Sequence, residues 1–210
     1  ELQALADAVA AVMSGAAGGV APSKAQLDLL GLTGVTADNL IAVQNAIAAT
    51  ADDGTGVDTL GELQAVVTAA TGAAQNALAI IAAYDGSNTA PTQQTYADAG
   101  VSGVNAANLA AVNSAVALLS STVTDTTAEV QAVVNAYAAV LNAADASDDN
   151  DAKPTQAQYA MLGVTGVDSA VEESLLGDVV DVKAAAAVDS VGELQALADA
   201  VAAVMSGAAG

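Results

Sequence analysis

The chain lacks cysteine, histidine, tryptophan and phenylalanine, and it contains only four tyrosines. The absence of cysteine excludes a disulfide framework and a thiol nucleophile, and the absence of histidine removes the commonest general acid or base. Carboxylate pairs such as Asp52–Asp53 and Glu172–Glu173 are adjacent in sequence, so they would not face each other across a substrate. We therefore predict a protein that is not an enzyme, with no catalytic residue and no bound cofactor.

Positive charge is almost absent, because three lysines and no arginine stand against 24 acidic residues, for a net charge of -21. Nucleic acids and anionic membranes are bound through lysine and arginine, so neither is an expected partner. The longest apolar run, "ALAIIAAY" at residues 77–84, falls short of the roughly 20 residues of a membrane-spanning helix, so membrane insertion is not expected. Strong acidity keeps an alanine-rich chain soluble by repulsion, and it favours an extracellular location over a cytoplasmic one.

A motif, E-[LV]-Q-A, recurs at Glu1, Glu62, Glu129 and Glu193, at intervals of 61, 67 and 64 residues. The three prolines, Pro22, Pro91 and Pro154, follow it at a variable distance, which indicates a surface loop, and precede the next motif by 38 to 40 residues. Residues 193–210 also repeat residues 1–18 letter for letter, which gives a larger period of 192 residues (193 minus 1). We therefore expect a slice of a longer tandem array, although a copy of the first helix added as a cap would leave the same pattern.

Each repeat is expected to contain three helices. The first begins at the motif, and its predicted buried face is Leu2, Leu5, Val9 and Val12 or their equivalents. A hydroxyl residue three positions before the motif glutamate predicts a capping box at Thr59, Thr126 and Ser190. That role makes the glutamate a helix cap and not a catalytic acid.

The second helix is predicted to be short and to start after each proline, at Ser23, Thr92 and Thr155. Its predicted ends are left-handed glycine caps at Gly31, Gly100 and Gly163, and its predicted core residues are Leu27, Tyr96 and Tyr159. The predicted N-caps of the third helix are Thr36, Asn105 and Asp168. Gly177 and several charges lie inside the last third helix, which we expect to be bent or offset.

The sequence therefore predicts an all-α fold of tandem three-helix repeats of about 64 residues each, arranged as a rod-like or superhelical array. The predicted boundaries are 1–61, 62–128 and 129–192 for three repeats, and 193–210 for the first helix of a fourth.

Two acidic loops make calcium the alternative to having no cofactor. The loop "DASDDND" at residues 145–151 offers Asp145, Asp148, Asp149 and Asp151 as candidate ligands, and "ADDGTGVD" at 51–58 is the second. Calcium takes six to eight oxygen ligands from flexible loops, but neither loop has the spacing of an EF-hand. The other interpretation is a solvated turn with no metal.

The string "PTQQTYADAGVSGVNAANLAAVNSAV" at residues 91–116, with weaker copies after Pro22 and Pro154, resembles repeats of giant acidic surface proteins of Gram-negative bacteria. These include type I-secreted adhesins and biofilm-associated proteins. The resemblance covers all three repeats, except that the third lacks the "NL..VN" part. It implies export, calcium-rich surroundings and a spacer or cohesive role, and it carries no catalytic residues.

We therefore expect a structural segment of an extracellular protein at the bacterial cell surface. It would act as an extender, or as a self-assembling building block of a filament or surface layer, in adhesion or biofilm. Its expected partners are neighbouring repeats of the same protein, with homotypic self-association. The alternative is a helical module, with or without bound calcium, that binds a protein or a glycan. Such modules usually present aromatic or arginine anchors, and aromatics make up 2% of this chain.

Overall fold

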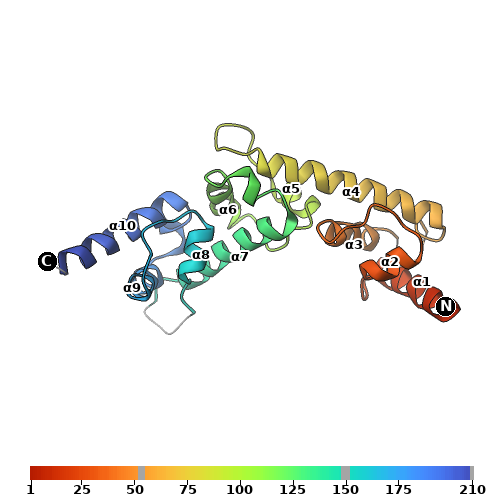
Figure 1. Ribbon diagram of the computed structural model, residues 1–210, viewed down its shortest axis with the longest axis horizontal. Helices are drawn as coiled ribbons and strands as arrows, with labels where there is room; N and C mark the ends of the chain where they lie inside the picture. Colours follow the sequence, from red (N-terminus) through yellow and green to blue (C-terminus); the bar gives the residue numbers. More distant parts are fainter. Residues whose placement is uncertain (52–54, 148–151, 209–210) are drawn as a thin grey trace. The chain divides into compact units, whose positions relative to one another are not determined.

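A computed structural model describes residues 1–51, 55–147 and 152–208 of the chain (Figure 1). Within these ranges the chain is 62% helical, with ten α-helices, two short 3-10 helices and no β-strand, which confirms the all-α prediction. The elements in order are α1 (Leu2–Ala16), α2 (Lys24–Leu29), α3 (Leu40–Ala48), α4 (Leu60–Ala82), α5 (Gln93–Asp98), α6 (Leu109–Val116), η1 (Ser121–Val123), α7 (Thr127–Ala143), α8 (Gln156–Met161), α9 (Ala170–Asp181), η2 (Ala185–Ala187) and α10 (Val191–Ala208).

The chain divides into two compact units. The first comprises Glu1–Ile80 with Gln94–Val101, and the second comprises Ile81–Gln93 with Ser102–Gly210. These units are defined by contacts in space, whereas the repeats are a period of the sequence. The tandem-repeat organisation, with its boundaries and its rod-like or superhelical form, therefore stays a prediction.

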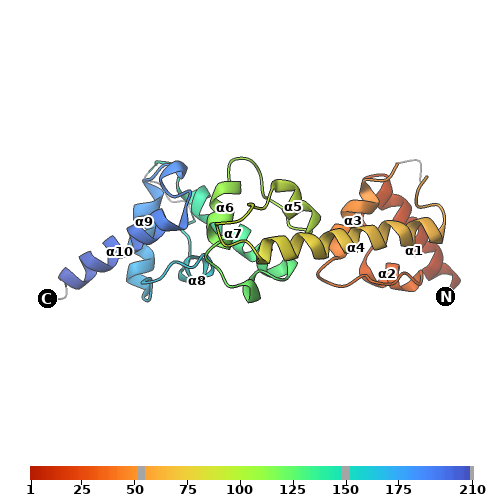
Figure 2. The same cartoon turned by 90° about the horizontal axis from the view of Figure 1, so that it is seen from above.

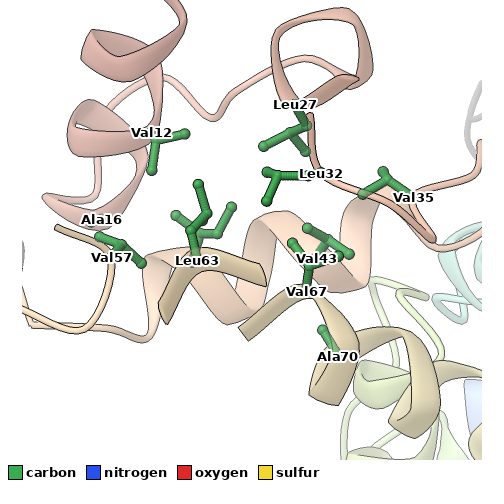
Figure 3. Close-up of a cluster of buried hydrophobic side chains, with 11 residues drawn as sticks. Val12, Ala16, Leu27, Leu32, Val35, Val43, Val57, Leu63, Val67 and Ala70 are labelled. Atoms are coloured by element: carbon green, nitrogen blue, oxygen red, sulfur yellow. The ribbon is translucent and has the colours of Figure 1, made fainter. Parts of the chain in front are cut away.

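The core of the first unit is built from small aliphatic side chains contributed by four helices. Figure 3 shows Val12 of α1, Leu27 of α2, Val43 of α3 and Leu63 of α4 directed toward a common interior. Alanine and valine supply most of this core, and such short side chains let the helices pack closely.

The core of the second unit is arranged around α7, which packs against α6, α8 and α9 (Figure 2). Tyr137, near the middle of α7, is fully buried, and its hydroxyl donates a hydrogen bond to the carbonyl oxygen of Val188 at 3.3 Å. Burial raises the pKa of Tyr137 far above its ordinary value, so the phenol stays neutral and remains a donor. α10 packs against α9 and, less extensively, against α6.

The short second helices follow the sequence prediction closely. Capping boxes form between Ser23 and Gln26 and between Thr155 and Gln158. The residues after the helix ends, Gly31, Gly100 and Gly163, all have φ near +80°. The predicted core residues Leu27, Tyr96 and Tyr159 are fully buried.

The third helices of the first two repeats begin three residues later than predicted. The predicted capping residues still bond the turn ahead of the helix, because Thr36 Oγ1 accepts from the backbone N–H of Asn39 at 3.3 Å and Asn105 Oδ1 accepts from that of Ala107 at 2.9 Å. α3 begins after Asn39, and the backbone N–H of Thr36 donates to Asn39 Oδ1 at 2.8 Å. The Asn39 side-chain amide in turn donates to the carbonyl oxygen of Gly34 at 2.8 Å. Asn105 and Asn108 repeat this arrangement before α6. The asparagine therefore closes a turn ahead of the helix, which delays the first helical residue.

The third helix of the last repeat also differs from its prediction. The N-cap of α9 is Ser169 and not Asp168, because the Ser169 hydroxyl accepts from the backbone N–H of Glu172. α9 runs without interruption through Gly177, so the offset lies at its start. A Cβ on Gly177 would lie 2.9 Å from Lys153 Cβ, which explains the glycine as a point of close approach.

Among the described residues, one helix is long and apolar enough to cross a membrane by length and composition. It is α4, whose most apolar 18-residue window has a mean hydropathy of 1.5. The hydropathy comes from valine, leucine, isoleucine and alanine interrupted by polar residues, so it does not appear as one unbroken apolar run. A core helix of a soluble protein passes the same test.

Candidate functional site

The E-[LV]-Q-A motif begins a long helix, and its glutamate caps that helix at three positions. At Glu129 the backbone N–H donates to Thr126 Oγ1 at 3.2 Å, while the backbone N–H of Thr126 donates to Glu129 Oε2 at 3.2 Å. The same reciprocal pair joins Thr59 to Glu62, and Ser190 to Glu193. The three capping boxes predicted from the sequence are therefore confirmed.

These caps shift the acidity of the glutamates that form them. The hydrogen bond from Thr126 lowers the pKa of Glu129, and the interaction with the Asp58 carboxyl group and the hydrogen bond from Thr59 lower the pKa of Glu62. A pKa that is lower in the folded state contributes stability above the unfolded value, and this contribution is lost as the pH falls through the folded value. The caps are thus fully formed at neutral pH.

The glutamine of the same motif clamps the helix to the turn that follows the preceding short helix. Gln131 Oε1 accepts from the backbone N–H of Ser102 at 2.8 Å, and Gln131 Nε2 donates to the Ser102 carbonyl oxygen at 3.1 Å. Gln64 holds Thr33 at 3.0 and 3.2 Å, and Gln195 holds Thr165 at 2.9 and 3.1 Å. One side-chain amide therefore satisfies both backbone groups of a turn residue, in three equivalent places.

Reasoning from the sequence assigned the glutamate of the motif a role but assigned none to the glutamine. The available signal was the recurrence of glutamine as the third residue of the four-residue motif, together with the recurring turn "G-[LV]-[ST]-G-V". The missing information was that the turn is left with an unpaired N–H and C=O that a side-chain amide can reach.

The two copies of the motif helix that share one sequence offer an internal test of this clamp. We expect Gln195→Ala to lower the free energy of unfolding by about 1–2 kcal/mol, because two backbone groups lose their partner. Gln3→Ala should change it by no more than about 0.5 kcal/mol, because Gln3 is exposed and donates to Asp7 of its own helix. Chemical denaturation of the two variants measures both. Equal losses would mean that the clamp contributes nothing beyond local helix contacts.

The central motif helix, α7, buries two different faces along its length. Val130, Val134 and Tyr137 form one face, which we call the upstream face. Ala136, Val140 and Ala143 form the other, which we call the downstream face. Because α7 contacts α6 before it and both α8 and α9 after it, one helix joins the elements on its two sides.

The first and last motif helices, which have the same sequence, each bury one of these faces. In α10 the upstream face is buried, with Leu194 at 0% and Val201 at 5% exposure. In α1 the equivalent residues Leu2 and Val9 are 85% and 51% exposed. The predicted buried face of residues 1–18 is therefore wrong for α1 in all but Val12, because no preceding elements cover it among the described residues.

The downstream face shows the reverse pattern. Val12 of α1 is 2% exposed and packs with α2 and α3, whereas its equivalent in α10, Val204, is 63% exposed. Gly15 of α1 is buried as well, while Gly207 of α10 is exposed. Taken together, the faces buried by α1 and α10 reproduce the two faces of α7.

The candidate calcium ligands are only partly described. Asp145 is exposed, and its Oδ1 accepts from the backbone N–H of Ser147 at 2.9 Å, which closes a local turn. Asp148, Asp149 and Asp151 lie outside the described residues. Across the described part of the chain, no three acidic side chains are grouped closely enough to hold a metal ion.

We expect the melting temperature to be the same in excess calcium and in excess chelator, because Asp145 already uses a carboxylate oxygen in its turn. Differential scanning calorimetry in the two buffers, with magnesium as the control for ionic strength, measures this. A midpoint that rises with calcium but not with magnesium would establish calcium as a ligand of the loop.

The described surface also carries shallow hollows. One in the first unit has a volume of about 380 Å³ and is lined mainly by alanines of α3 and α4, with Asn45, Gln94 and Asp98 as its polar groups.

A scan of protein-family models, a search of curated proteins and a search of solved structures each find no match for this chain.

Proposed function

We propose that the chain is a non-enzymatic structural segment of an extracellular bacterial protein, in which motif helices link successive three-helix repeats into an extended array. It would serve as an extender, or as a building block of a filament or surface layer, in adhesion or biofilm. The observation that carries the proposal is that the glutamate cap and the glutamine clamp recur together at the motifs that begin with Glu62, Glu129 and Glu193. We call this combination of cap and clamp the joint.

That joint has the properties that an extender requires. The glutamate cap fixes where the long helix begins, and the glutamine clamp fixes how it meets the preceding turn. α7 then carries the connection forward through its downstream face. In repeat proteins each element contacts only its neighbours, so a repeated joint of this kind adds length without a new core.

Charge and composition agree with the same role. The net charge of -21 opposes collapse of neighbouring segments onto one another, and it keeps an alanine-rich surface in solution. The hollow in the first unit is lined by alanine and lacks the aromatic or arginine anchors that dominate binding interfaces. A binding module, with or without calcium, is the weaker alternative.

Small-angle X-ray scattering tests the proposal on three chains, which carry one, two or three joined copies of residues 1–192. Each chain ends with a single copy of residues 193–210. An extender predicts that every added copy increases the maximum dimension by the same amount. A maximum dimension that grows much more slowly than the number of copies would contradict it, because the copies would then fold back into a compact body. Low and high salt separate a structural effect from charge repulsion.

A further inference from the structure

The exposed downstream face of α10 has a surface in this protein that matches it. Residues 193–210 have the same sequence as residues 1–18, and α1 already seats that sequence against α2 and α3. The groove that receives α1 is formed by Pro22, Leu27 and Val43 together with Ile47. Whatever fits α1 in this groove must also fit α10.

We infer that the downstream face of α10 docks into the α2–α3 groove of a second copy of this chain, where it takes the place of that copy's α1. The inference rests on the proposed function, and it specifies how separate chains would associate. The donor helix would keep its upstream face on its own α9, as it does in the isolated chain. It would then bury both faces, as α7 does.

In the exchange, the groove would receive from α10 the same side chains that it receives from α1 in the free chain. The contacts that α1 loses, through Ala8, Val12 and Gly15, are regained by Ala200, Val204 and Gly207 of the incoming helix. The upstream face of α1 is exposed in the free chain, so releasing α1 uncovers nothing on that side. α10 is already helical through Ala208 and anchored by Gln195, so its docking residues need little further ordering. The released α1 regains conformational freedom, which favours the exchange.

A glycine makes the match specific. A Cβ on Gly15 would lie 2.9 Å from Pro22 Cδ and 3.6 Å from Ile47 Cγ2, so the groove accepts only glycine at this position without displacement. α10 has Gly207 there, whereas α4 and α7 have Asn76 and Ala143 at the equivalent positions. Among the four motif helices, α10 is therefore the one that can replace α1 without a steric conflict.

The same glycine provides a test in the full-length chain. Gly207→Ala places a methyl group in open space in the free protein and raises helix propensity, so the variant should fold normally. In the exchanged complex that methyl group would meet Pro22 of the second copy. We expect the substitution to weaken association by about tenfold or more, the effect of overpacking a close-packed contact.

Gly15→Ala should have the opposite effect. It forces α1 against Pro22 in its own groove and so opens the groove to α10 of another copy. We expect association to be stronger than in the parent chain. The double variant Gly15→Ala/Gly207→Ala should associate about as strongly as the parent, because both competing helices then meet Pro22 in the same way. Gly192→Ala is the matched control, because it lies on the same helix in open space and α7 has Ala128 at the equivalent position.

Sedimentation velocity over a wide range of protein concentrations measures association, and circular dichroism confirms that each variant is folded. Stronger association of Gly15→Ala, weaker association of Gly207→Ala and a double variant close to the parent chain support the exchange. Equal association of Gly207→Ala and the parent chain overturns it, as does a monomer in every variant. A monomeric result leaves the extender proposal intact, because the scattering of joined copies tests that proposal separately.

Discussion

Replacing Tyr137 by alanine is expected to lower the free energy of unfolding of the second unit by about 3–5 kcal/mol. Tyr137 is one of the largest fully buried side chains of the described residues, and it belongs to the upstream face of α7. Removing a fully buried ring leaves a cavity that the surrounding structure closes only in part. The loss should therefore fall in the upper part of the range for core truncations.

Tyr137→Phe separates packing from hydrogen bonding in this prediction. The phenylalanine keeps the ring but removes the donor to the Val188 carbonyl oxygen, so we expect a loss of only about 1 kcal/mol. Urea denaturation of the two variants and the parent chain, followed by circular dichroism, supplies the comparison. If Tyr137→Ala costs no more than Tyr137→Phe, then the ring contributes no packing and α7 is not the centre of this core.

Helix capping was the part of the fold most predictable from the sequence. The pairs Thr126–Glu129 and Ser23–Gln26 obey a local rule, because donor and acceptor lie within four residues and the geometry follows from the chain itself. α3 begins three residues later than predicted because Thr36 and Asn39 bond each other's backbone N–H groups and close a turn ahead of the helix.

The glutamine clamp and the two buried faces could not be read from local rules. Gln131 reaches Ser102, which is 29 residues earlier, so its partner depends on how the elements pack. The apolar residues of α1 predict one buried stripe, but which part is buried depends on the neighbours that are present. Two copies of one sequence with opposite burial show that periodicity indicates which residues can be buried and not which ones are.

This difference in burial leads to the other large effect that we expect. Leu194→Ala should lower the free energy of unfolding by about 2–5 kcal/mol, because Leu194 is fully buried at the start of α10. Leu2→Ala removes the same atoms from the same local sequence, yet it should change stability by no more than about 0.5 kcal/mol, because Leu2 is exposed. Leu2 is the first residue of α1 and Leu194 is the fourth of α10, but Leu→Ala changes helix propensity by only a few tenths of a kcal/mol, so a difference of about 2 kcal/mol or more measures tertiary packing.

The downstream face supplies the reverse pair in the same experiment. Val12→Ala should destabilise the chain by about 1–3 kcal/mol, because Val12 is buried against α2 and α3, whereas Val204→Ala should be close to neutral in the monomer. Thermal and urea unfolding at low protein concentration keep association out of the measurement. Similar losses for Leu2 and Leu194, or for Val12 and Val204, would mean that both helices bury the same face in solution. The opposite losses expected here would show that one helix sequence can bury either its upstream or its downstream face, and that the neighbouring elements decide which face is buried.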